Sequence, residues 1–341
     1  MTGKENLQRA ISFGGPEHLP VQIDINYEWL NEKNNEKTEK IENLRKTIFE
    51  DMIVCGYHAP ERIEKTEKLN EKKWFDEWNV GWIDDGHGAR TFQHPLEKGY
   101  HLINEVSFPE GGNEDWFISA SERYAKNKDK YKVGTVWFTL FERLWMLRGF
   151  NNMLMDPYLD YENFALLQEK VLEFNLKQID NWIKLKADAV YFSDDWGSQR
   201  TLLMNPEDWR RIYKPAYKKM FRKVRDNHMN VFMHLCGNVI DILPDLIDIG
   251  LNVLNPVQPQ AMNIDELSRR FGGYLCFYGG VDVQGTMVNG TKQEVKDEVH
   301  HLIRQLGKFG GGYIGGTSHS IMPETPLDNI IAMLEAFNEY Q

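Results

Sequence analysis

The sequence contains few cysteines and no long apolar run. Its 341 residues include only three cysteines, Cys55, Cys236 and Cys276, which does not indicate a disulfide framework. No apolar stretch approaches the ~20 residues needed to cross a bilayer. The opening residues, MTGKENLQRAISF, lack the basic, apolar and small-residue order of a signal peptide. We therefore expect a soluble cytoplasmic protein that does not act at a membrane.

An excess of positive charge is also lacking. The chain has 40 Lys and Arg against 51 Asp and Glu, a formal net charge of −11. Proteins that bind duplex nucleic acid need a basic surface that displaces phosphate counterions. This balance argues against a nucleic-acid partner and favours a small-molecule substrate or a protein partner.

A repeating alternation of strands and helices is present from Val133 onward. Short apolar runs alternate with amphipathic segments at intervals of about 20 to 35 residues, the repeat typical of a (β/α)8 barrel. The predicted strands are Leu19–Ile25, Asp188–Phe192, Asn230–Leu235, Val253–Leu254, Tyr274–Tyr278 and Gly312–Ile314. The predicted helices are Asp160–Lys186, Pro206 to about Asn227, Ile240–Ile249, Asn263–Phe271, Lys292–Leu306 and Thr325–Phe337. We expect one α/β TIM-barrel domain over residues 1–341.

Two N-terminal regions depart from this alternation. From about Trp29 to Lys73 the sequence is rich in Glu, Lys and Asn, with sparse apolar residues at helical spacing. This composition predicts solvated helices over the barrel rim. Residues 74–106, with several tryptophans and glycines, predict short strands or a ribbon near the mouth of a pocket.

Polar side chains follow the predicted strands. In α/β barrels the catalytic groups project from the C-terminal strand ends, so these residues are expected at one mouth. They are Asp194 and Asp195, His234 and Cys236, Asn255 and Gln258, Asp282 and Gln284, and Ser318 and His319.

The spacing of His234 and Cys236 is typical of two ligands of one metal. Residues two apart on a strand share a face and lie about 7 Å apart. A thiolate with an imidazole favours zinc, whose catalytic sites keep three protein ligands and one open position. His319, at the end of the last strand, is the candidate third ligand. Alternatively, His234 hydrogen-bonds a substrate and Cys236 is a small buried hydrophobic residue.

Two further features concern the substrate side of the mouth. Successive strand residues face opposite ways, so we expect Asp195 to point inward and Asp194 to form local hydrogen bonds. The aromatic residues could form a wall around a substrate or could be ordinary core. They are Trp82, Trp137, Phe141, Trp145 and Trp196.

Several dispersed motifs occur together in this order and resemble those of the uroporphyrinogen decarboxylase superfamily. They are Arg9 to Phe13, Pro16 to Val21, Asp76 to Trp78, His94 to Leu96, Phe141 to Trp145, Asp194 to Gly197, His234 to Gly237, Asn255 to Gln258 and Pro323 to Pro326. The resemblance covers nearly the whole chain. It implies a (β/α)8 barrel with N-terminal helical and rim-ribbon additions.

The superfamily has two branches with different chemistry. True uroporphyrinogen decarboxylases work without a metal and carry an N-terminal Arg-Gln-Ala-Gly-Arg run that grips the substrate carboxylates. Here the segment after Val21 reads Asp24, Ile25, Asn26, Tyr27 and has no arginine. The other branch comprises corrinoid-dependent methyltransferases. Its coenzyme M methyltransferases resemble this chain in the His-X-Cys pair and have a further cysteine after the last strand, at the position that His319 occupies here. This difference argues against thiol methylation by the coenzyme M route.

The resemblance favours a methyltransferase that uses zinc and moves a methyl group from a small methoxylated aromatic to a separate corrinoid-binding protein. His234, Cys236 and His319 are then the metal ligands, and His234 and Asp195 the catalytic residues. Trp145, Trp196, Asn255, Gln258 and Asp282 are the expected substrate-binding residues. A decarboxylase-like lyase and a non-catalytic barrel that binds a small acid are the alternatives. The oligomeric state stays open, with a homodimer as one option.

Overall fold

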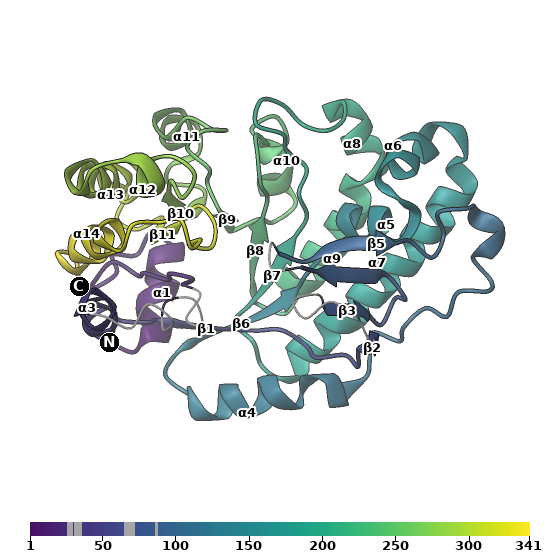
Figure 1. Ribbon diagram of the computed structural model, residues 1–341, viewed down its shortest axis with the longest axis horizontal. Coiled ribbons are helices and arrows are strands. Elements are labelled where there is room, and N and C mark those ends of the chain that lie inside the picture. Colours follow the sequence, from purple (N-terminus) through teal and green to yellow (C-terminus); the bar gives the residue numbers. More distant parts are fainter. Residues whose placement is uncertain (26–29, 31–35, 65–71, 86–87) are drawn as a thin grey trace.

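The computed structural model describes residues 1–25, 30, 36–64, 72–85 and 88–341. Its centre is a curled sheet of seven parallel strands with helices around it (Figure 1). In spatial order the strands are β1 (Met52–Cys55), β6 (Tyr131–Val136), β7 (Ala189–Ser193), β8 (Asn230–His234), β9 (Val253–Asn255), β10 (Cys276–Val281) and β11 (Tyr313–Thr317). Because each strand pairs with the next in chain order, the predicted barrel-type α/β fold is confirmed.

The helices agree with the predicted alternation, with local differences. They are α1 (Gly3–Ile11), α3 (Glu36–Thr47), α4 (Ile118–Lys126), α5 (Phe141–Arg148), α6 (Phe150–Leu159), α7 (Tyr161–Lys184), α8 (Pro206–Ile212), α9 (Lys214–Asp226), α10 (Leu243–Asp248), α11 (Ile264–Phe271), α12 (Thr286–Asn289), α13 (Lys292–Leu306) and α14 (Leu327–Asn338), with 3-10 turns η1 (Tyr100–Leu102) and η2 (Glu114–Phe117). The single helix predicted from Pro206 is broken at Tyr213, since Pro215 has no N–H to continue it. Among the described residues, no helix combines the length and apolarity needed to span a bilayer.

The segment predicted as the first barrel strand lies beside β11 but is not a continuous strand. Val21 pairs with Gly315 and Ile25 with Ile321, both in parallel, as isolated bridges. Pro20 O accepts from Gly315 N, and Gln22 N donates to Gly315 O, at 2.8 and 2.9 Å. Residues 22–25 then line the cavity described below. Where a complete barrel would have its eighth strand, residues 21–25 therefore form only two isolated bridges.

The prediction of rim helices from about Trp29 to Lys73 is wrong in part. Of its described residues, Leu30 and α3 are helical, and α3 is followed by β1, which pairs in parallel with β6, and by β2 (Arg62–Glu64). Residues 26–29, 31–35 and 65–71 of this region lie outside the described residues. The predicted ribbon is confirmed as an antiparallel sheet of β2, β3 (Lys72–Phe75), β4 (Gly81–Asp84) and β5 (Arg90–Gln93).

An inner apolar cluster closes one end of the barrel. Its members lie on inward-facing strand positions and on α1: Leu7, Ile11, Met52, Tyr131, Val133, Ala189, Tyr191, Phe232, Val253, Cys276 and Ile314. Alternate residues, such as Val190 and Phe192, belong instead to the large cluster between the sheet and the helices. Because side chains alternate along a strand, inward positions continue upward to Ser193 on β7 and His234 on β8.

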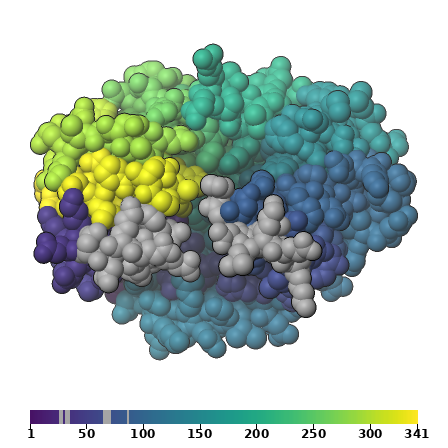
Figure 2. Space-filling view, viewed as in Figure 1, coloured from purple at the N-terminus to yellow at the C-terminus, as the bar shows by residue number. Residues whose placement is uncertain are grey.

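The two ends of the chain lie side by side. Helices α3 and α14 pack together on one flank of the molecule, where N- and C-terminal colours meet (Figures 1 and 2). Lys37 pairs with Asp328 at 2.6 Å, and Lys40 with Glu335 at 2.7 Å. These exposed pairs each add little stability, so packing rather than charge holds this flank.

The outward face of β6 offers a test of the packing between sheet and helices. Gly134 faces the fully buried Trp182 of α7, whose indole N–H donates to Thr135 O. A Cβ on Gly134 would lie 2.2 Å from Trp182 Cδ2. We expect Gly134→Ala to lower the free energy of unfolding by about 1–3 kcal/mol, measured by urea denaturation. Gly14→Ala is the control, because its Cβ would meet nothing nearer than 3.5 Å; equal losses in both variants would contradict this account.

Candidate metal centre

A cavity of about 670 Å³ opens at the C-terminal ends of the barrel strands. Its polar lining comes from several strand ends: Gln22, Asp24, Arg45, Glu142, Ser193, Asp195, His234, Asn255, Thr317, His319 and Ser320. Its aromatic lining consists of Trp137, Phe138, Tyr191 and Tyr278. The cavity is therefore both polar enough to hold an ion and aromatic enough to hold a planar ring.

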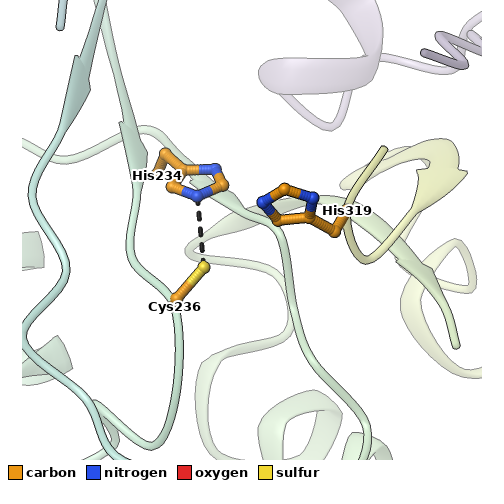
Figure 3. A group of neighbouring side chains, drawn as sticks. All are labelled: His234, Cys236 and His319. Atoms are coloured by element: carbon orange, nitrogen blue, oxygen red, sulfur yellow. Dashed lines mark hydrogen bonds between the residues drawn. The ribbon is translucent and has the colours of Figure 1, made fainter. Parts of the chain in front are cut away.

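His234 and His319 line this cavity, and Cys236 lies beside them (Figure 3). One ligand atom from each lies within 4.8 Å of the other two, and His234 Nε2 is 3.2 Å from Cys236 Sγ. In a tetrahedral zinc site with bonds of 2.0–2.3 Å, ligand atoms are roughly 3.3–3.6 Å apart. Small side-chain movements would therefore let all three bind one ion.

The loops after β7 and β8 fix Cys236 through close backbone contact. Gly197 N donates to Cys236 O at 3.1 Å, and Cys236 N donates to Asp195 Oδ1 at 2.9 Å. A Cβ on Gly197 would lie 2.5 Å from Cys236 O, and Gly237 has a φ of +79°. Glycines at these two positions allow the loops to meet, and the thiol then lies next to His234 Nε2.

The loop that carries His319 is pinned on both sides of this residue. Ser318 N donates to Val281 O at 2.8 Å, and the hydroxyl of Ser320 donates to Asp24 at 2.7 Å. His319 itself is exposed, and its ring centroid lies 6.2 Å from that of His234 (Figure 3). Its ring therefore closes the third side of the candidate metal centre.

Asn255 fixes the orientation and tautomer of His234. Its amide N–H donates to Tyr278 O at 3.1 Å, which points its Oδ1 toward His234. That oxygen accepts from Tyr191 OH at 2.5 Å and lies 2.6 Å from His234 Nδ1, which must therefore carry the proton. Nε2 is left with a free lone pair, the state that binds a metal. Asn255, predicted to bind substrate, lines the cavity, and these contacts also make it a support for His234.

Burial shifts the pKa values of His234 and Cys236 in opposite directions. It lowers the pKa of His234, which favours the neutral imidazole. Burial, followed by the Asp195 carboxylate, raises the pKa of the Cys236 thiol. The thiol is therefore protonated until a cation displaces its proton, so metal binding here releases a proton at neutral pH.

The two adjacent aspartates face different environments. Asp194 is fully buried and accepts from the backbone N–H groups of Leu140, Phe141 and Glu142 at 2.7–3.0 Å, and from Tyr217 OH. It therefore caps the first turn of α5. Asp195 lines the cavity, 3.8 Å from His234 Nε2. The structure thus places Asp195 beside the candidate metal centre and Asp194 behind it.

Four expected substrate-binding residues do not line the cavity. Trp196 is completely buried, stacks on Phe141 and donates to Tyr217 OH, because its strand-end position faces the helices. Trp145 packs on His94 and Phe150 at the outer side of α5. Gln258 accepts from Gly237 N, and Asp282 bonds Gln260 and Gln284 N within its own loop region. These residues support the walls rather than touch the cavity.

Other residues reach the cavity that were not chosen from the sequence. Trp137 lies with its ring 5.9 Å from that of His234 and 5.2 Å from Tyr191. Glu142 lines the cavity from the first turn of α5. Trp137 had been considered only as one of several aromatic wall or core residues. Its inward position, two residues beyond Thr135 on β6, is the signal that would have singled it out.

Comparison with known proteins gives the same fold and a family. A solved structure described as a methyltransferase from Methanosarcina mazei matches with a TM-score of 0.70 at 16% identity, covering 100% of this chain and 99% of its own. The family model for uroporphyrinogen decarboxylase (URO-D) matches residues 137–340, more than half of the chain. The chain belongs to the uroporphyrinogen decarboxylase family.

Curated relatives of this family member carry two kinds of name. A uroporphyrinogen decarboxylase of Nostoc punctiforme is 23% identical over 190 residues, 55% of this chain and 50% of the relative. The methylcobamide:CoM methyltransferase MtaA of Methanosarcina barkeri is 27% identical over 158 residues, 46% of this chain and 43% of the relative. The matched region thus spans half or less of each of these two relatives.

The support that Asn255 gives His234 can be tested by metal affinity. We expect Asn255→Ala to weaken zinc binding by about 10- to 100-fold, because His234 loses the acceptor that fixes its tautomer. Competition with a chromogenic chelator measures the affinity. Asn329→Ala is the matched control: Asn329 is also buried and donates two backbone hydrogen bonds, but on α14, away from the cavity. An unchanged zinc affinity in Asn255→Ala would show that His234 does not need this partner.

Proposed function

We propose that this protein is a zinc-dependent methyltransferase. Its reaction moves a methyl group from a small methoxylated aromatic donor to a corrinoid held by a separate protein. The observation that carries the proposal is the convergence of His234, Cys236 and His319 at the edge of an aromatic-lined cavity that both histidines line. A family relative named as a methylcobamide:CoM methyltransferase supports the same class of reaction.

The donor set fits zinc and has room for an incoming ligand. Two imidazoles and one thiol are ligands that zinc prefers, and catalytic zinc sites keep one open position. A bound zinc would act as a Lewis acid and stabilise negative charge on the oxygen that loses its methyl group. The side chains around it hold the donor: Trp137 offers a ring face, and Asp195 lies within reach of a polar substituent.

The cavity matches a small, uncharged aromatic in size and character. Its volume of about 670 Å³ is within the range of ligand pockets of about 300–1,000 Å³. Trp137, Tyr191 and Tyr278 supply an aromatic surface next to His234. A ring stacked on Trp137 would bring a methoxy group close to the candidate metal centre, where a nucleophilic corrinoid can reach it from the mouth.

Decarboxylation of uroporphyrinogen is the second candidate, because several relatives carry that name. Such a substrate has eight carboxylates and needs counter-charge. The cavity lining contains the carboxyl groups of Asp24, Glu142 and Asp195, whereas Arg45 is its one Lys or Arg among the described residues. Arg45 is itself paired with Glu50 at 2.9 Å. This charge balance disfavours a polyanionic substrate.

The reaction can be tested without knowing the natural corrinoid protein. Zinc-loaded enzyme is mixed with free cobalamin reduced to cobalt(I) and with methoxyphenols, and the absorbance change on methylation is followed. We expect methylation, and a fall of about 100-fold or more in Cys236→Ala, since losing a Lewis acid removes several kcal/mol of stabilisation. Cys55→Ala is the control, because that buried cysteine does not belong to the cluster of His234, Cys236 and His319.

The same preparation is offered uroporphyrinogen, for which we expect no porphyrin product. Full activity of Cys236→Ala with aryl ethers would show that a metal held by Cys236 is not needed for the reaction. Turnover of uroporphyrinogen together with no methylation from any aryl ether would favour the decarboxylase instead. Zinc binding without turnover of either substrate would favour a barrel that only binds a small molecule.

A further inference from the structure

Glu142 is a buried carboxyl group that faces the same cavity. It lies in the first turn of α5 and its residue exposure is 8%. The backbone N–H of Glu142 donates to Asp194 at 2.7 Å, so the cap on α5 fixes where this side chain begins. The carboxyl group lines the cavity together with Ser193, Asp195 and His234.

The carboxyl group of Glu142 has one hydrogen-bond partner within the described part of the chain. The hydroxyl of Ser193 donates to Glu142 Oε2 at 3.0 Å. Ser193 is held in turn, because its own N–H donates to Thr139 Oγ1 at 3.1 Å. One carboxyl oxygen is therefore fixed by Ser193, and the other is available to a ligand in the cavity.

The charges near Glu142 favour its protonated form. Asp194 and Asp195 follow β7 on one side, and the Cys236 thiol lies on the neighbouring loop. Arg143 is adjacent in sequence, but its guanidinium points away, 2.7 Å from Asp76 and over the ring of Trp78. Burial first, and then the two aspartates, raise the pKa of Glu142 well above its ordinary value.

We propose that Glu142 is a catalytic residue that gives its proton to the ether oxygen of the methyl donor as the methyl group leaves. This inference rests on the proposed methyltransferase function. The methyl carbon breaks its bond to oxygen and bonds to cobalt(I), which supplies the electron pair and becomes cobalt(III). The pair of the broken bond stays on oxygen, which takes the Glu142 proton, so the product is a neutral phenol. Water then returns a proton to the carboxylate.

The proton matters most when the leaving oxygen is basic. An unactivated phenol has a pKa near 10, like the tyrosine side chain, so its anion is a poor leaving group in a cavity with acidic side chains. A positioned general acid contributes typically 10²- to 10⁴-fold to such a step. An electron-poor phenol leaves readily as an anion and gains little from the proton.

The experiment compares Glu142→Gln with the zinc-loaded parent enzyme on a series of methoxyarenes whose phenols span a wide range of pKa. We expect a loss of about 10²- to 10³-fold for unactivated ethers, shrinking to less than about tenfold for the most electron-poor ones. A carboxyl that merely supports Ser193 would produce the same loss for every donor, which would overturn the proposal.

Glu298→Gln is the matched control. Glu298 is also a buried carboxyl group, and burial raises its pKa to about 7, but it lies on α13 outside the cavity lining. The same substitution there should leave the dependence on the leaving group unchanged. A change equal to that of Glu142→Gln would show that the effect is not specific to the cavity.

Two measurements do not depend on the activity of the variant. The infrared difference between the parent enzyme and Glu142→Gln at neutral pH should contain the C=O stretch of a protonated carboxylic acid. The parent enzyme alone should show a normal solvent deuterium isotope effect on methyl transfer from unactivated ethers. An ionised carboxylate band or the lack of an isotope effect would refute the proton donor. An enzyme that demethylates no aryl ether at all would instead refute the proposed function.

Discussion

The arrangement of the cavity depends on the hydrogen bonds of the Asp194 carboxylate. Asp194 joins three elements: it follows β7, caps α5 through three backbone N–H groups and accepts from Tyr217 OH on α9. Burial raises its pKa to about 7, but these four donors stabilise the charged form. Because α5 is tethered there, Glu142 turns toward the cavity and Arg143 turns toward Asp76. This one buried acceptor thereby keeps the Arg143 guanidinium away from the carboxyl group of Glu142.

The electrostatics of the cavity explain which partners suit it. Among the described residues, its lining has three carboxyl groups against the single cation of Arg45, and the Cys236 thiol lies beside His234. A divalent cation would be attracted to this lining, and an uncharged donor would not be repelled by it. The hydrogen bond to Asn255 fixes the Nδ1-protonated tautomer of His234, and burial favours its neutral form. The same set of side chains would thus favour a bound cation and disfavour a polyanion.

Sequence patterns predicted the fold better than they predicted the details of the site. The regular alternation after Val133 and the His-X-Cys spacing depend only on periodicity, which survives in the structure as β8 and its inward residues. Strand β1 was missed because its four residues, Met52–Cys55, are too short to stand out among charged neighbours. Trp196 was misjudged because it lies past the strand end, where the chain turns and the alternation no longer holds. The supporting role of Asn255 depends on contacts with Tyr191 and Tyr278 from other strands, which no local pattern encodes.

The inner apolar cluster has a consequence for the order of events in catalysis. Leu7 and Ile11 of α1 pack against the inner residues of the strands and close one end of the barrel. The cavity opens to solvent at the other end, where the strands have their C-termini. A small donor and a large corrinoid protein would both have to use that opening. Under the proposed methyl transfer, the donor would therefore enter first, and the demethylated product would leave only after the larger protein departs. Steady-state kinetics would be sequential and ordered, with the small product inhibiting competitively against the donor.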